Sequence, residues 1–185
     1  MNLLISLHNA VFSLVEKLFG PLLPVLARFV FAAVLLGYFW NSAKTKVGDG
    51  IFGIFFPSTG AYWQIFPRRM AESSNLDQFG IVDWFVIFSG TASEFLLPLL
   101  IVIGLFTRIA SIGMIVFIVV QSLTDIVGHG ADATTIGHWF DRFSGALILD
   151  QRTLWVFVLI TLIVKGAGPV SVDWFLNRRR QAESG

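Results

Sequence analysis

Four segments of the sequence are long and apolar enough to cross a lipid bilayer, and they decide the class of fold. They cover about residues 22–40, 81–106, 109–127 and 152–165, of which the last is the shortest. A helix needs ~20 mostly apolar residues to span a bilayer. Charged residues make up only 14% of the chain, against ~25% in a typical soluble domain. We therefore expect an all-α integral membrane protein that folds as a four-transmembrane-helix bundle.

The N-terminal residues 1–20 predict an amphipathic interfacial helix that lies on the membrane surface. Leucine and valine recur at helical spacing from Leu3 to Leu18, and polar residues fall largely between them. The Gly20-Pro21 pair is typical of a break between this helix and the first span. An early start of the first span is the alternative interpretation.

The connections between the spans indicate how the bundle is oriented. The very short turn "GLFTRIA" makes the second and third spans antiparallel neighbours. With four spans, both termini lie on one side of the membrane. Six Lys and Arg residues fall on each side, but "NRRR" closely follows the last span, which favours the cytoplasm for the termini. Residues 178–185 would then be a basic cytoplasmic tail, with enlarged outer loops at residues 41–80 and 128–153.

Three polar residues are expected deep in the membrane. Glu94 and Gln121 both lie roughly 18 Å from the inner ends of their spans, and Arg28 lies roughly 9 Å from the inner end of the first. An unpaired charge costs at least ~2.5–3.5 kcal/mol in hydrocarbon, so these groups should face the interior and find partners. Pro98 frees the carbonyl of Glu94 and favours a kink that opens a polar pocket. The alternative is a buried Arg28–Glu94 pair that only fixes helix register.

A second group of polar residues is expected near the outer surface. Lys44 and Asp125 lie at similar heights there, with His129 above them, and Trp63 and Trp139 would line the outer mouth of the site. Asp125 and His129 are four residues apart but supply only two ligands, so we predict no metal site. The chain has no cysteine, which excludes disulfides and thiolate-bound metals.

Three stretches resemble the DoxX family of small four-span bacterial membrane proteins. They are "LARFVFAAVLLGYFWNSAK", "SEFLLPLLIVIGLFTRIASIGM" and "KGAGPVSVD", and together they touch all four spans. The resemblance implies a DoxX-like domain over residues 21–177 in the bacterial inner membrane. It also implies that the family's polar positions are occupied by Arg28, Lys44, Glu94 and Arg108. The long loops after spans one and three depart from the usual family pattern.

The resemblance constrains the fold more than the activity. Members of the family have been linked to membrane redox systems, including subunits similar to thiosulfate:quinone oxidoreductase. The first hypothesis is therefore a redox-associated membrane subunit that holds a quinone or a small anion at Arg28, Glu94 and Gln121. The chain shows no self-contained catalytic motif and no electron cofactor of its own, so it would need a redox partner protein or the quinone itself.

Two other hypotheses belong to different classes of function. One is a non-enzymatic membrane scaffold or assembly factor that binds a partner through its outer loops. The other is a small proton-coupled transporter built around Glu94, for which four spans are few and no inverted repeat is evident. A homo-oligomer would meet that objection. The net charge of +1 gives no indication of nucleic-acid binding.

Overall fold

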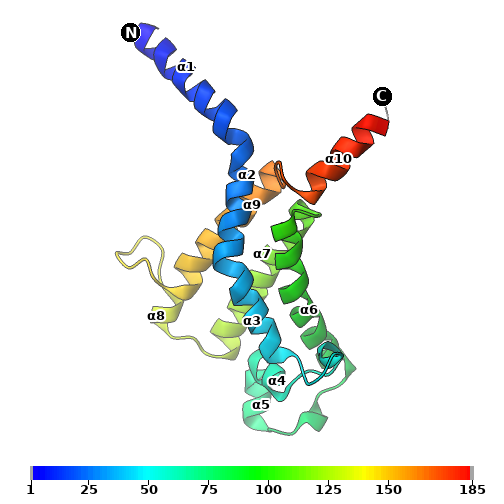
Figure 1. Cartoon of the computed structure of the whole chain (residues 1–185). Helices are drawn as coiled ribbons and strands as arrows, with labels where there is room; N and C mark the ends of the chain where they lie inside the picture. Colours follow the sequence, from blue (N-terminus) through cyan, green and yellow to red (C-terminus); the bar gives the residue numbers. More distant parts are fainter. Residues whose placement is uncertain (1, 184–185) are drawn as a thin grey trace.

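The computed structural model of the protein describes residues 2–183, and every regular element in this range is helical. One isolated β-bridge, between Val47 and Pro57, is the exception to the helical pattern. Four helical stretches are long and apolar enough to cross a membrane: Asn2–Lys46, Ile81–Ile103, Thr107–Gly128 and Leu147–Lys165. The chain is thus an all-α, multi-pass membrane protein, as the sequence predicts (Figure 1).

The first span is part of a helical run that continues through the expected break. The run comprises α1 (Asn2–Phe19), a 3₁₀ turn (Gly20–Leu22), α2 (Leu23–Phe31), a π-helical segment (Ala32–Leu36) and α3 (Gly37–Lys46). Pro21 is tolerated because the first turn of a helix has no use for its missing N–H. α1 projects from the bundle and has no buried residue (Figure 1). Its position on the membrane surface stays a prediction.

The four spans pack in a closed ring. The other three are α6 (Ile81–Ile103), α7 (Thr107–Leu123) with its π-helical extension Thr124–Gly128, and α9 (Arg152–Lys165) with the preceding π-helical segment Leu147–Gln151. α2 contacts α9, α3 contacts α6, and α7 contacts both α6 and α9. The buried centre is apolar and includes Phe31, Leu35, Phe39, Ile101, Met114, Ile118, Leu159 and Leu162.

The turn between α6 and α7 makes these helices antiparallel neighbours, as the sequence predicts. It depends on Gly104, which ends α6 with φ +73°, a conformation that favours glycine. A Cβ at this position would lie 2.5 Å from Cβ of Ser171 and 2.9 Å from Cζ of Arg28. Glycine thus lets the segment after α9 approach the end of α6.

Short helices cover the end of the bundle opposite the termini (Figure 1). They are α4 (Thr59–Ile65), α5 (Pro67–Glu72) and α8 (Ala133–Ile136), all far too short to span a membrane. An ion pair of 2.6 Å between Arg69 and Asp83 ties α5 to the first turn of α6. At the other end, α10 (Val172–Glu183) projects away from the bundle beside the C-terminus (Figure 1). We call these two ends the loop end and the terminal end.

Candidate functional site

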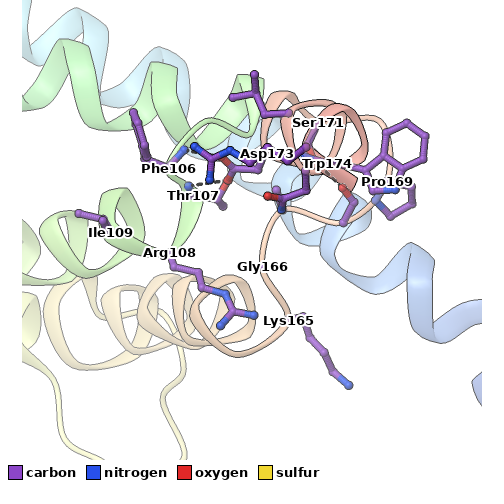
Figure 2. A pocket seen from close by; sticks show the side chains of 15 residues that line it. Phe106, Thr107, Arg108, Ile109, Lys165, Gly166, Pro169, Ser171, Asp173 and Trp174 are labelled. Atoms are coloured by element: carbon purple, nitrogen blue, oxygen red, sulfur yellow. Dashed lines mark hydrogen bonds between the residues drawn. The ribbon is translucent and has the colours of Figure 1, made fainter. Parts of the chain in front are cut away.

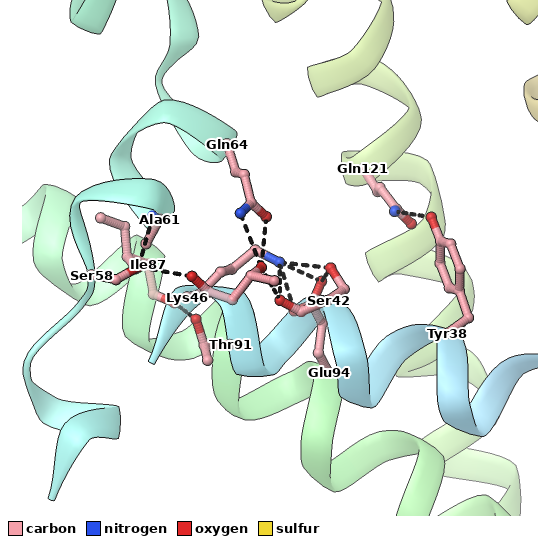
Figure 3. Close-up of polar contacts among 11 residues, drawn as sticks. Tyr38, Ser42, Lys46, Ser58, Ala61, Gln64, Ile87, Thr91, Glu94 and Gln121 are labelled. Atoms are coloured by element: carbon pink, nitrogen blue, oxygen red, sulfur yellow. Dashed lines mark hydrogen bonds and ion pairs between the residues drawn. The ribbon is translucent and has the colours of Figure 1, made fainter. Parts of the chain in front are cut away.

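A buried ion pair between Lys46 and Glu94 is the centre of the candidate site (Figure 3). Nζ of Lys46 lies 3.0 Å from Oε1 and 2.8 Å from Oε2 of Glu94, so both carboxylate oxygens are engaged. The hydroxyl of Ser42 donates to Oε1 of Glu94 at 3.1 Å, and its oxygen lies 2.8 Å from Nζ of Lys46. The side chains of Lys46 and Glu94 are only 8% and 3% exposed. The pair therefore joins α3 to α6 through charge-assisted hydrogen bonds within the bundle.

The lysine of this pair is not the one that the sequence analysis selected. Lys44 is exposed, whereas Leu35, Phe39 and Lys46 are buried on one face of the first span. Their spacing of four and seven residues is that of a single helix face. Lys44 was selected because the first span was expected to end near Trp40. Had the apolar periodicity been followed beyond that residue, Lys46 would have been found.

Arg28 does not contact Glu94, so the three polar residues expected deep in the membrane do not form one group. Its guanidinium donates instead to the carbonyls of Ile101 at 3.1 Å and Val102 at 2.5 Å, both in the last turn of α6. It also donates to the carbonyls of Ala167 at 3.3 Å and Val170 at 3.1 Å, in the segment after α9. Carbonyls at a helix C-terminus lack intrahelical partners and carry partial negative charge, so they attract a cation. Arg28 thus stabilises the terminal end and takes no part in the site.

Gln121 lies on α7 and contacts the first span through Tyr38. Its Nε2 donates to the Tyr38 hydroxyl at 2.9 Å (Figure 3). Its Oε1 is buried without a hydrogen-bond partner among the described residues. An unpaired buried acceptor costs ~1–3 kcal/mol, which a bound donor would recover.

Asp125 pairs with Arg152, whereas Lys44, which was expected at a similar height, forms no ion pair with it among the described residues. Nη2 of Arg152 lies 2.5 Å from Oδ2 of Asp125, and Nη1 donates to the Ser122 hydroxyl at 2.8 Å. Arg152 was counted with the cations of the outer side, at the expected start of the last span, but this span begins at Leu147 and buries Arg152. The sequence signal was the run of apolar residues before Asp150, which extends the shortest span toward its N-terminus.

A cavity of about 190 Å³ brings four of the predicted residues together beside Lys46. Glu94, Gln121, Asp125 and His129 all line it, whereas Arg28 and Lys44 do not. Val86 of α6 and Val120 of α7 also line the cavity, and both side chains are exposed on the outer surface of the bundle. The cavity therefore opens sideways between α6 and α7, toward the space that lipid occupies.

A second hollow of about 470 Å³ adjoins the cavity at the loop end, and the two share Gln64 and His129 as lining residues. A ring nitrogen of His129 lies 3.0 Å from the Gln64 carbonyl, between the two spaces. Trp63 lines the second hollow. Trp139 lines neither, because its indole nitrogen donates to the carbonyl of Leu149 further along the chain. Only one of the two predicted mouth tryptophans therefore lies near the site.

The described residues hold no group of three or more side chains arranged to bind a metal ion. Comparison of the chain with protein-family models, with curated proteins and with solved structures found no match.

Proposed function

We propose that the protein is a DoxX-like, redox-associated subunit of the bacterial inner membrane that holds the head group of a membrane quinone in this cavity. One observation carries the proposal: a cavity beside the buried Lys46–Glu94 pair opens to the lipid-facing surface at Val86 and Val120. A ligand dissolved in the bilayer would reach such a site without crossing water.

The size of the cavity suits one substituted ring. A volume of about 190 Å³ compares with the ~150 Å³ of an engineered cavity that binds benzene. An isoprenoid tail would remain outside the mouth, along Val86 and Val120, where lipid would cover it. The aromatic ring of Phe117, which also lines the cavity, would pack against the head group.

The polar groups suit a neutral ligand better than a small anion. Two carboxylates, of Glu94 and Asp125, line the cavity, and Lys46 is the only Lys or Arg residue among the lining positions. This cation is already engaged by both oxygens of Glu94. Quinol hydroxyls would donate to the unpaired Oε1 of Gln121 and to Nδ1 of His129, whose Nε2–H already donates to the carbonyl of Gln64. The anion that the sequence analysis also considered is therefore disfavoured.

The apolar core favours a protein that binds a ligand over one that transports a solute through the bundle. Phe39, Met114 and Ile118 are buried between the cavity and the terminal end. A polar solute that crossed the bundle would have to pass this packed layer, which contains no ionisable group. A proton-coupled transporter is therefore the weaker hypothesis, and we propose a site closed toward the termini, which we place in the cytoplasm.

Lipid-resolving mass spectrometry of the full chain in native nanodiscs tests the proposal. We expect a quinone mass to stay with the wild type and with Glu72→Gln, a matched change on exposed α5. Glu94→Gln removes the charge that Lys46 requires, so the quinone should be lost. A folded wild type that retains no quinone would refute the proposal.

The loop end favours one second candidate, a scaffold that binds a partner protein. Phe140 is fully exposed at φ +66°, and Trp139 and Phe143 beside it are more than half exposed. Exposed aromatic groups of this kind are typical of protein interfaces. Replacement of residues 139–143 by a glycine-serine linker would abolish crosslinking to a partner under this hypothesis, while Glu94→Gln would leave it intact. The reverse pattern would favour the quinone site.

A further inference from the structure

A groove at the terminal end of the bundle is separate from the proposed quinone site. It has a volume of about 650 Å³ and lies between the start of α7, the segment at residues 166–171 and α10 (Figure 2). None of its lining residues lines the cavity beside Lys46. The proposed quinone site therefore does not explain the groove.

Three cations line the groove: Arg108 at the start of α7, Lys165 at the end of α9 and Arg180 in α10. None of them forms an ion pair with another residue in the part of the chain that the structure describes, where the three ion pairs involve other side chains. Arg108 makes one long hydrogen bond, of 3.4 Å, to the carbonyl of Val164. These charges are therefore available to a ligand.

The one carboxylate in the groove is already engaged. Oδ1 of Asp173 accepts from the N–H of Phe106 at 2.8 Å, and Oδ2 accepts from both the N–H and the hydroxyl of Thr107, at 3.0 and 2.9 Å (Figure 2). Asp173 thus caps the start of α7 and does not pair with the cations. The lining carries three positive charges and one negative, so the groove attracts anions.

The position of the groove in the bilayer identifies the kind of anion. Arg108 and Lys165 stand at the ends of two spans, which is the level of the lipid head groups. Trp174 also lines the groove, and its side chain is 41% exposed, as is typical of the interfacial aromatic belt. Val170, Phe175 and Leu176 are exposed beside it and would contact the upper part of an acyl chain.

We propose that this groove binds the phosphate of an anionic phospholipid head group. Arginine presents a planar fork that matches phosphate oxygens, and lysine supplies a compact charge, so the three side chains suit this group. Basic pockets between helices at a membrane surface bind anionic head groups by the same chemistry. With the lipid bound, α10 would be held near the membrane surface by Arg180.

The test is native mass spectrometry of the full chain released from nanodiscs of mixed phosphatidylglycerol and phosphatidylcholine. The groove variant replaces Arg108, Lys165 and Arg180 by Gln. The control replaces Lys17, Lys44 and Arg142 by Gln, which removes the same charge from exposed positions outside the groove. We expect the groove variant to lose roughly a hundredfold in phosphatidylglycerol retention, because three interfacial cations are removed. The control should change little.

Other outcomes would overturn the proposal. Equal losses in both triple variants would show nonspecific attraction to a basic surface. Binding of inorganic phosphate to wild type in pure phosphatidylcholine nanodiscs, measured by titration calorimetry and lost in the groove variant, would make this a site for a soluble anion. If the triple variant does not fold, Arg180→Gln on exposed α10 replaces it. A loss of about fivefold is then expected relative to Lys17→Gln, which removes one exposed charge outside the groove; equal retention would refute the assignment.

Discussion

Replacing Lys46 by Met tests the central ion pair most directly. Methionine keeps an unbranched stem of similar length, so packing against α6 is largely preserved and the loss reports the ammonium group. The change leaves the Glu94 carboxylate buried, with only the Ser42 hydroxyl as a hydrogen-bond partner among the described residues. We therefore predict a large loss of stability when the ammonium group of Lys46 is removed.

The size of the effect follows from the burial of both partners. Their side chains are 8% and 3% exposed, and removal of one member of a buried pair costs about 3–5 kcal/mol. For a chain of this length, each kcal/mol lowers Tm by about 2–4 °C. We therefore expect Lys46→Met to lower Tm by about 6–20 °C.

Thermal unfolding in nanodiscs, followed by tryptophan fluorescence, measures this shift. The matched control is Lys44→Met, which removes the same charge two residues earlier on an exposed position. It should lower the free energy of unfolding by no more than about 1 kcal/mol, as is usual for exposed charges.

The double variant Lys46→Met/Glu94→Met separates the pair from its surroundings. Well-packed apolar residues often replace a buried ion pair without loss of stability, so the double variant should recover most of the Tm lost by Lys46→Met. It should still fail to retain quinone, because the polar wall of the cavity is gone. Equal Tm values for Lys46→Met and Lys44→Met would refute the buried pair and the reasoning built on it.

Three further predictions concern the two ends of the bundle. Gly104→Ala should lower the free energy of unfolding by more than ~1–2 kcal/mol, the cost of the left-handed conformation alone, because its Cβ would also meet Arg28; a Tm measurement would show it, and an unchanged Tm would contradict the close approach. Asp173→Ala should cost about 0.5–2 kcal/mol, as for other lost N-terminal caps, and hydrogen exchange should rise in the first turn of α7 and not elsewhere. Arg152→Met should destabilise by about 1–3 kcal/mol, less than Lys46→Met because the carboxylate left behind is 30% exposed, whereas Arg142→Met, on an exposed loop, should leave Tm within about 2 °C.

The fold was predictable from the sequence because bilayer thickness sets the length of an apolar helix. The second and third spans begin or end within about three residues of their expected bounds. The lengths expected for the first and last spans were too short. The reason is that charged residues were taken to mark the membrane surface, and Lys46 and Arg152 lie near the ends of these spans. Both side chains are buried in ion pairs instead.

Four of the residues that line the cavity could be predicted from the sequence, but Lys46 and the side-chain pairs could not. Depth along a helix placed Glu94, Gln121, Asp125 and His129 at the loop half of the bundle, where they line one cavity. The position of a residue along a helix does not specify the direction in which its side chain points around the helix axis. Depth therefore could not tell which cation faces Glu94. The partners of Arg28 could not be predicted for another reason. They are backbone carbonyls, which every residue carries, so the sequence does not indicate which of them Arg28 contacts.

The carbonyls around Arg28 bear on the order in which the chain is assembled in the membrane. Arg28 belongs to the first of these four spans to be synthesised, while two of its acceptors, at Ala167 and Val170, follow the fourth. Until some 140 further residues have been synthesised, its guanidinium lacks half of its final acceptors. An early chain therefore carries a cation whose bonds only the completed bundle can supply, so this single side chain couples insertion of the first helix to arrival of the last.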